Sequence, residues 1–101
     1  MSFRLAIHEE AFRELDEAER YIESRRRGYG RIFRAEVESC LRFILERPTG
    51  YAERRAGYRY GSVARFPYRV IYRIHGDVVF IAAVYHGKRK PYGWMRRTMD
   101  T

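Results

Sequence analysis

The sequence is poor in the residue types that most often reveal a metal centre or a disulfide framework. It has one cysteine, Cys40, which excludes a disulfide within the chain and a zinc site built from cysteines. The three histidines, at positions 8, 75 and 86, are scattered without the spacing of metal ligands. We therefore expect no metal and no cofactor.

Long apolar runs are missing as well. The apolar run at residues 78–85 spans eight residues, whereas a transmembrane helix needs about 20. The N-terminus, MSFRLAIHEEAFRE, has two acidic residues by position 10 and no apolar stretch of the signal-peptide kind. We expect a cytoplasmic protein with no membrane partner.

Lysine is nearly absent although the chain is strongly basic. Lys88 and Lys90 are the only lysines among 21 Lys and Arg residues, which outnumber 13 Asp and Glu and give a net charge of +8 and a pI of about 10.1. Arginine suits planar recognition of carboxylates and phosphates better than lysine does. The excess indicates an anionic partner, which can be nucleic acid, an acidic protein or a membrane surface, or else a charged surface that only aids solubility.

With 101 residues, of which 46% are apolar, the chain can form one domain, residues 1–101, with a single core. A strand is predicted at residues 3–7. Two amphipathic helices follow at about 9–26 and 31–47 and should form an antiparallel hairpin. Their inward stripes are predicted as Phe12, Leu15, Ala18 and Ile22 in the first helix, and Phe33, Val37, Cys40 (or Leu41) and Ile44 in the second.

The second half of the chain changes to the two-residue period of strands. Strands are predicted at residues 58–63, 68–75 and 78–86, and Gly76-Asp77 between the last two is typical of a type II′ hairpin turn. The order β-α-α-β-β-β predicts an α+β fold. In this fold an antiparallel α-helical hairpin packs on one face of a small, largely antiparallel sheet.

The two-residue turn also assigns the side chains of the last two strands to the two faces of the sheet. Arg69 should lie opposite Val84, and alternation should put Arg69, Arg73 and His86 on the face away from the helices. The face under the helices would hold Val70, Tyr72, Ile74, Val79, Ile81 and Ala83. Cations gathered on one open face indicate a binding surface.

Three stretches of the chain resemble the ParE/RelE superfamily of bacterial toxins from type II toxin–antitoxin systems. They are GYR at 57–59, FPYRVIYRI at 66–74 and HGKRKPYGW at 86–94, and the similarity covers essentially the whole chain. The Phe-Pro-Tyr entry and the His-x-x-Arg-x-Pro segment are its diagnostic parts. The resemblance implies a small basic cytoplasmic toxin, held inactive by a cognate antitoxin with an acidic, partly disordered tail.

The superfamily divides in mechanism. RelE-like members cleave mRNA in the ribosome without a metal, and ParE-like members block DNA gyrase. For a RelE-like nuclease, the resemblance implies Arg59, Arg69, His86 and Arg89 as catalytic candidates, with His86 as acid or base. Gly61 stands where RelE has a lysine, and no tyrosine clearly falls where its stacking tyrosine belongs.

The FPY entry and the KRKPYGW ending are more similar to ParE. Our hypothesis is a ParE-like toxin that grips its target, with Arg69, Arg73, His86, Lys88, Arg89 and Trp94 as target-binding residues. Two alternatives remain, a metal-independent mRNA endoribonuclease acting on the ribosome and a stand-alone nucleic-acid-binding module. Only the endoribonuclease would be an enzyme.

Overall fold

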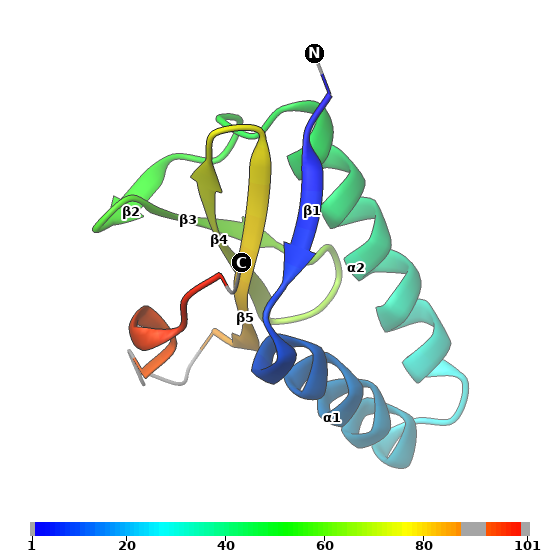
Figure 1. Cartoon of the computed structure of the whole chain (residues 1–101). Coiled ribbons are helices and arrows are strands. Elements are labelled where there is room, and N and C mark those ends of the chain that lie inside the picture. Colours follow the sequence, from blue (N-terminus) through cyan, green and yellow to red (C-terminus); the bar gives the residue numbers. More distant parts are fainter. Residues whose placement is uncertain (1, 88–92, 100–101) are drawn as a thin grey trace.

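The computed structural model describes residues 2–87 and 93–99. Five strands form one sheet in the order β1-β5-β4-β3-β2, and two helices cover one of its faces (Figure 1). The elements are β1 (Arg4–Ile7), α1 (Glu9–Arg25), α2 (Tyr29–Glu46), β2 (Glu53–Arg55), β3 (Tyr58–Ser62), β4 (Tyr68–His75), β5 (Val78–His86) and the 3₁₀ helix η1 (Gly93–Arg96). Strand β1 runs parallel to β5, and the other pairs are antiparallel. The predicted α+β fold is confirmed. The structure has one more strand than predicted, β2, which was not predicted because its three exposed residues show no alternation of apolar and polar side chains.

Helix α1 begins where the sequence supplies a cap. His8 precedes it, and the Nδ1 atom of His8 accepts a hydrogen bond of 3.0 Å from the backbone N–H of Glu10. The buried side of α1 consists of Ala11, Leu15, Ala18 and Ile22. Phe12, predicted to face inward, is 50% exposed, so that prediction is wrong. Ala11, one position earlier, faces the sheet instead, and its small side chain lets α1 approach β5 closely.

Helix α2 follows after a tight turn and begins at Tyr29, slightly earlier than predicted. Its buried residues include the predicted Phe33, Val37, Cys40 and Ile44. Gly28 in the turn has a φ of +87°, a conformation that favours glycine. At Gly30 a Cβ atom would lie 2.9 Å from Glu23 Oε1 and 3.0 Å from the carbonyl oxygen of Glu19. The helices can therefore come this close only because Gly30 lacks a side chain, whereas Gly28 is needed for the conformation of the turn.

The main core lies between the helical hairpin and the sheet. Phe33 meets the rings of Phe66 and Tyr68 edge to face, with centroids 5.2 and 5.1 Å apart. From the sheet, Val70, Tyr72, Val79 and Ile81 are buried here and Ile74 packs against them, as predicted. The Tyr72 hydroxyl donates to the carbonyl oxygen of Pro48 at 2.5 Å, which ties β4 to the end of α2.

A β-bulge between β4 and β5 changes the predicted register. Tyr72 pairs with Ile81 but Ile71 pairs with Ala83, so Ala82 is an extra residue in β5. Beyond this point each side chain of β5 turns to the face opposite to the predicted one, because the side-chain period of a strand is two. Ala83, expected under the helices, packs on the far face instead.

The bulge also separates cations that simple alternation would place together. Arg69 pairs with Tyr85 rather than with Val84, and Val84 joins the core under the helices. His86 pairs with Tyr68 and makes an edge contact with its ring, with centroids 5.3 Å apart. His86 therefore lies on the helix side of the sheet, and the prediction that it shares the far face with Arg69 is wrong.

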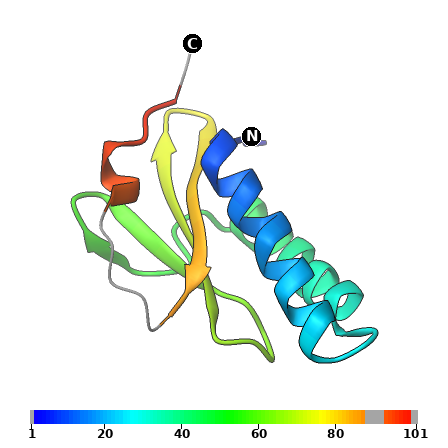
Figure 2. The same ribbon diagram turned by 90° about the horizontal axis from the view of Figure 1, so that it is seen from below.

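The far face of the sheet is covered by residues 93–99, here called the C-terminal strap (Figure 2). Trp94 is 3% exposed, and Met95 and Met99 pack beside it. The buried sheet residues of this second cluster are Tyr58, Ile71, Phe80, Ala82 and Ala83. The sheet thus has an apolar layer on each side, made by the helices on one and by the strap on the other.

Two further properties concern the residues that the structure describes. Among them no helix is long and apolar enough to cross a membrane. No three His, Cys, Asp or Glu side chains of these residues lie where they could hold a metal ion together.

Candidate target-binding face

The rim of the far face, beside the C-terminal strap, carries arginines stacked on tyrosines. Alternation along β3 points Tyr58 and Tyr60 to this face, and alternation along β4 does the same for Arg69 and Arg73. The Cζ atom of Arg73 lies 5.5 Å from the ring centroid of Tyr58. Those of Arg69 and of Arg54, from β2, lie 5.7 and 5.6 Å from the ring of Tyr60. These five residues are called the arginine–tyrosine face.

The described residues place no carboxylate beside the arginines of this face. Within residues 2–87 and 93–99, no carboxylate lies within 4.0 Å of the guanidinium groups of Arg54, Arg69 and Arg73. Contact with an aromatic ring orients a guanidinium without cancelling its charge. Arg69 and Arg73 are half-buried and therefore held in place, whereas Arg54 is exposed. The arrangement is suited to binding carboxylates or phosphates of a partner.

Trp94 supports this face from below. Its ring meets those of Tyr58 and Tyr60 edge to face, at 4.8 and 6.0 Å between centroids. Because Trp94 is 3% exposed, it cannot touch a target while the strap is in place. Its ring lies behind the two tyrosines rather than on the surface, and its role as a target-binding residue stays a prediction.

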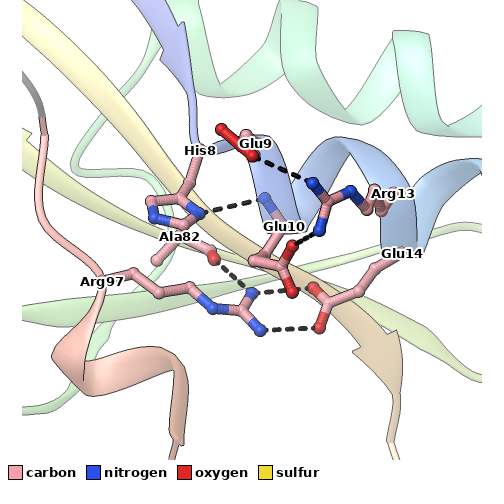
Figure 3. Close-up of polar contacts among 7 residues, drawn as sticks. All are labelled: His8, Glu9, Glu10, Arg13, Glu14, Ala82 and Arg97. Atoms are coloured by element: carbon pink, nitrogen blue, oxygen red, sulfur yellow. Dashed lines mark hydrogen bonds and ion pairs between the residues drawn. The ribbon is translucent and has the colours of Figure 1, made fainter.

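An arginine clamp holds the strap to the bulge (Figure 3). Arg97 donates from Nη1 and Nη2 to the two carboxylate oxygens of Glu14 at 2.9 and 3.0 Å, and from Nη1 to the carbonyl oxygen of Ala82 at 2.8 Å. The backbone N–H of Val84 donates to Glu14 Oε1 at 3.0 Å. Strand β1 pairs with β5 only as far as Ile81, so these side chains satisfy the backbone where β1 ends.

The nearby polar residues at the start of α1 have a structural explanation. His8 caps the helix, and Arg13 donates to Glu9 at 2.9 Å and forms an ion pair with Glu10 (Figure 3). The Arg13 side chain is 63% exposed, so these ion pairs form a surface network of small energetic weight. Neither His8 nor the acidic residues belong to the candidate site.

The three nuclease candidates that lie within the described residues, Arg59, Arg69 and His86, do not come together. Arg69 lies on the far face, but Arg59 pairs with Tyr72 on the helix side and donates to the carbonyl oxygen of Tyr51 at 2.7 Å. His86 lines a cavity of about 470 Å³ between α1 and β5, together with Glu14, Glu17 and Tyr21. Lys88 and Arg89 were also predicted as site residues and lie outside the described residues.

Sequence reasoning missed three members of the face. Tyr58 and Tyr60 alternate within YRYGS, and this spacing beside the arginines of the next strand could have revealed them. Arg54 could not have been found, because its three-residue strand has no apolar alternation.

Known proteins resemble the chain in sequence and in fold. The family described as "ParE toxin of type II toxin-antitoxin system, parDE" matches residues 5–91. No curated protein sequence matches the chain.

Among solved structures, the chromosomal ParDE TA system from P. aeruginosa aligns with a TM-score of 0.69 and 16% identity, over 83% of this chain and 95% of that one. The toxin–antitoxin complex RelBE2 from Mycobacterium tuberculosis aligns with a TM-score of 0.59 and 24% identity, over 85% of this chain and 99% of that one. At these identities the solved structures show a shared fold.

Proposed function

Because the chain belongs to the ParE toxin family of type II toxin–antitoxin systems, we propose that it arrests growth by binding DNA gyrase and that a cognate acidic antitoxin neutralises it. The observation that carries the binding proposal is the arginine–tyrosine face. Its three guanidinium groups are oriented by tyrosine rings, and none of them forms an ion pair with a carboxylate of the described residues. Such groups are typical anchors of protein interfaces.

The geometry favours binding of a protein target over cleavage of RNA. Cleavage through a ribose 2′-OH needs a proton acceptor, cations at the phosphate and a platform for the base within one site. Here the sheet separates Arg69 from His86, the residue best suited as a base. A Cβ atom at Gly61 would lie 3.1 Å from the Sγ atom of Cys40, so the position that holds a lysine in RelE packs under α2. An RNase-like site would therefore lack the lysine, and its described candidates Arg69 and His86 would lie on opposite faces of the sheet.

The proposed antitoxin partner follows from charge and from the solved relatives. The ParDE and RelBE2 structures are of toxin–antitoxin systems, and this chain carries a net charge of +8. An acidic segment that folds on binding would place its carboxylates on Arg54, Arg69 and Arg73. In that arrangement the antitoxin covers the same surface that grips the target, so the two partners compete.

The test combines a gyrase supercoiling assay with primer extension on an mRNA translated in vitro. The parent protein should block supercoiling and leave the mRNA intact. Arg69→Ala with Arg73→Ala should raise the half-inhibitory concentration by roughly 30-fold, equivalent to about 2 kcal/mol. The matched control, Arg42→Ala with Arg47→Ala, removes the same charge from exposed positions on α2 and its end and should change inhibition little.

His86→Ala separates the two mechanisms. It should leave the block of supercoiling unchanged, because His86 lies away from the arginine–tyrosine face. Cleavage of mRNA at codon positions that disappears in His86→Ala and in Arg69→Ala would refute the gripping proposal. Expression of the chain alone should arrest growth, and co-expression of the cognate antitoxin should restore it. Failure to arrest growth would contradict the toxin assignment itself.

A further inference from the structure

The turn between the two helices forms a second basic surface, away from the arginine–tyrosine face. It comprises Tyr21 and residues 25–31, RRRGYGR, and is called the hairpin tip. Arg25, Arg26, Arg27 and Arg31 are all exposed. In both ribbon views the tip lies at the end of the helical hairpin farthest from the strands (Figures 1 and 2). It is therefore accessible while the sheet face is occupied.

The charge of the tip is not cancelled locally. Among the described residues no carboxylate lies within 4.0 Å of these four guanidinium groups. Glu23, the acidic residue at this end of α1, uses its carboxylate to accept the backbone N–H groups of Gly28 and Gly30 at 3.0 and 2.9 Å. These hydrogen bonds lower the pKa of Glu23, with a smaller contribution from the charges of Arg27 and Arg31. Glu23 thus caps α2 and offsets only one of the positive charges.

Two tyrosines orient two of the four arginines, Arg25 and Arg26. The Cζ atom of Arg26 lies 4.2 Å from the ring centroid of Tyr29, and that of Arg25 lies 5.8 Å from the ring of Tyr21. Tyr21 is itself 57% exposed. A guanidinium group stacked on a ring is held with its N–H donors at the edge, where they can reach phosphate oxygens in pairs.

The shape and chemistry of the tip select among anionic partners. Among the residues that the structure describes, no apolar residue lines the hollow beside the tip, whose acidic and basic residues are equal in number: Asp16, Glu19, Arg20, Glu23, Ser24, Gly28, Arg31 and Arg34. An acidic peptide that folds on binding needs an apolar groove for its anchors. Duplex nucleic acid needs only cations, because it carries about one charge for every 1.7 Å of helix axis.

We propose that the hairpin tip binds duplex nucleic acid through its phosphate backbone, without reading the sequence. The four exposed arginines, gathered around the turn at Gly28, bind the phosphates. This binding is independent of the antitoxin and of the arginine–tyrosine face, so it adds a nucleic-acid contact to a toxin whose proposed target acts on DNA.

The experiment is a titration of the full chain with a fluorescent DNA duplex of about 20 base pairs, followed by anisotropy between about 50 and 200 mM salt. The tip variant combines Arg25→Gln, Arg26→Gln and Arg27→Gln. The control combines Arg4→Gln, Arg42→Gln and Arg47→Gln, which lowers the net charge equally at exposed positions elsewhere. Circular dichroism verifies that both variants fold.

The tip variant should flatten the slope of log K against log salt by about 2–3, since each phosphate that is no longer neutralised changes the slope by roughly 0.9. The control should change the slope by less than about 1. Equal changes in both variants would overturn the proposal, because they would show that the overall charge drives binding. Absence of duplex binding at low salt would overturn it too. So would a glutamate-rich peptide that binds in a tip-dependent way and displaces the duplex, since the tip would then be a surface for acidic protein.

Discussion

Replacing Glu14 by alanine should release the C-terminal strap from the sheet. The carboxylate of Glu14 accepts two hydrogen bonds from Arg97 and one from the N–H of Val84. In Glu14→Ala the guanidinium group keeps, among the partners that the described residues supply, the carbonyl oxygen of Ala82, and the N–H of Val84 loses its acceptor. The strap should then detach locally and expose Trp94.

The magnitude follows from the partial burial of the pair. The side chains of Arg97 and Glu14 are 19% and 29% exposed. Breaking a fully buried ion pair costs about 3–5 kcal/mol, and an exposed pair contributes at most about 1 kcal/mol. We therefore expect Glu14→Ala to lower the free energy of unfolding by about 2–4 kcal/mol. Glu14→Gln, which keeps an oxygen for Val84 but removes the charge, should cost about half as much.

Urea unfolding measures these costs by circular dichroism, while the fluorescence of Trp94, the only tryptophan, reports the strap. Glu14→Ala should shift the emission of Trp94 to longer wavelength in native buffer. The control is Glu9→Ala, on the same helix with a side chain 76% exposed, which should cost less than about 1 kcal/mol. A double-mutant cycle with Arg97→Ala should give a coupling of about 1–3 kcal/mol. Equal costs for Glu14→Ala and Glu9→Ala, with unchanged emission, would refute the clamp.

Two substitutions and one labelling experiment test other parts of the structure. Trp94→Ala should lower the free energy of unfolding by about 3–5 kcal/mol, measured by urea titration, because it empties the cluster between strap and sheet. Glu23→Gln should destabilise the protein at neutral pH but not in acid. Because the pKa of Glu23 is lowered in the folded state, its carboxylate contributes stability above pH 4.5, the ordinary pKa, and this stability is lost as pH falls through the folded-state pKa. The urea midpoint, measured as a function of pH, should show this loss in the parent protein and not in the variant. Burial raises the pKa of the Cys40 thiol from 9.0 to about 11, so a thiol reagent at pH 8 should label Cys40 only as fast as the protein opens. The stability that the neutral thiol contributes is present below pH 9 and is lost as pH rises toward 11.

Much of the fold could be predicted from local patterns. The bounds of β4 and β5 and the turn at Gly76 are as predicted, because an alternating run broken by glycine leaves few other conformations. Gly76 alone of the two turn residues has a positive φ, at +55°, as a type II′ turn requires. The helices and most of their buried stripes follow from the 3.6-residue period. The prediction for Phe12 was wrong because Ala11 and Phe12 both fit the apolar stripe of α1, and the smaller side chain, Ala11, is the one that packs against the sheet.

The candidate site could be predicted only in part. Arg69 and Arg73 were placed on the correct face because they lie on β4, the strand without the extra residue. His86 was not, because one extra residue at Ala82 reverses the face of all that follows it in β5. The residue types around Ala82 in β5 give no sign that this position holds an extra residue.

By itself, the sequence determined the family, the basic charge, the helical hairpin and the two long strands, since each depends on residue type or on neighbours close in the chain. Only the tertiary structure decided the bulge and the strap. The bulge is stabilised by Glu14 and Arg97, whose separation along the chain is 83 residues, and Trp94 is buried by tyrosines from a distant strand. Such contacts depend on how the whole chain closes on itself, so they determine which cations share a face and which are kept apart.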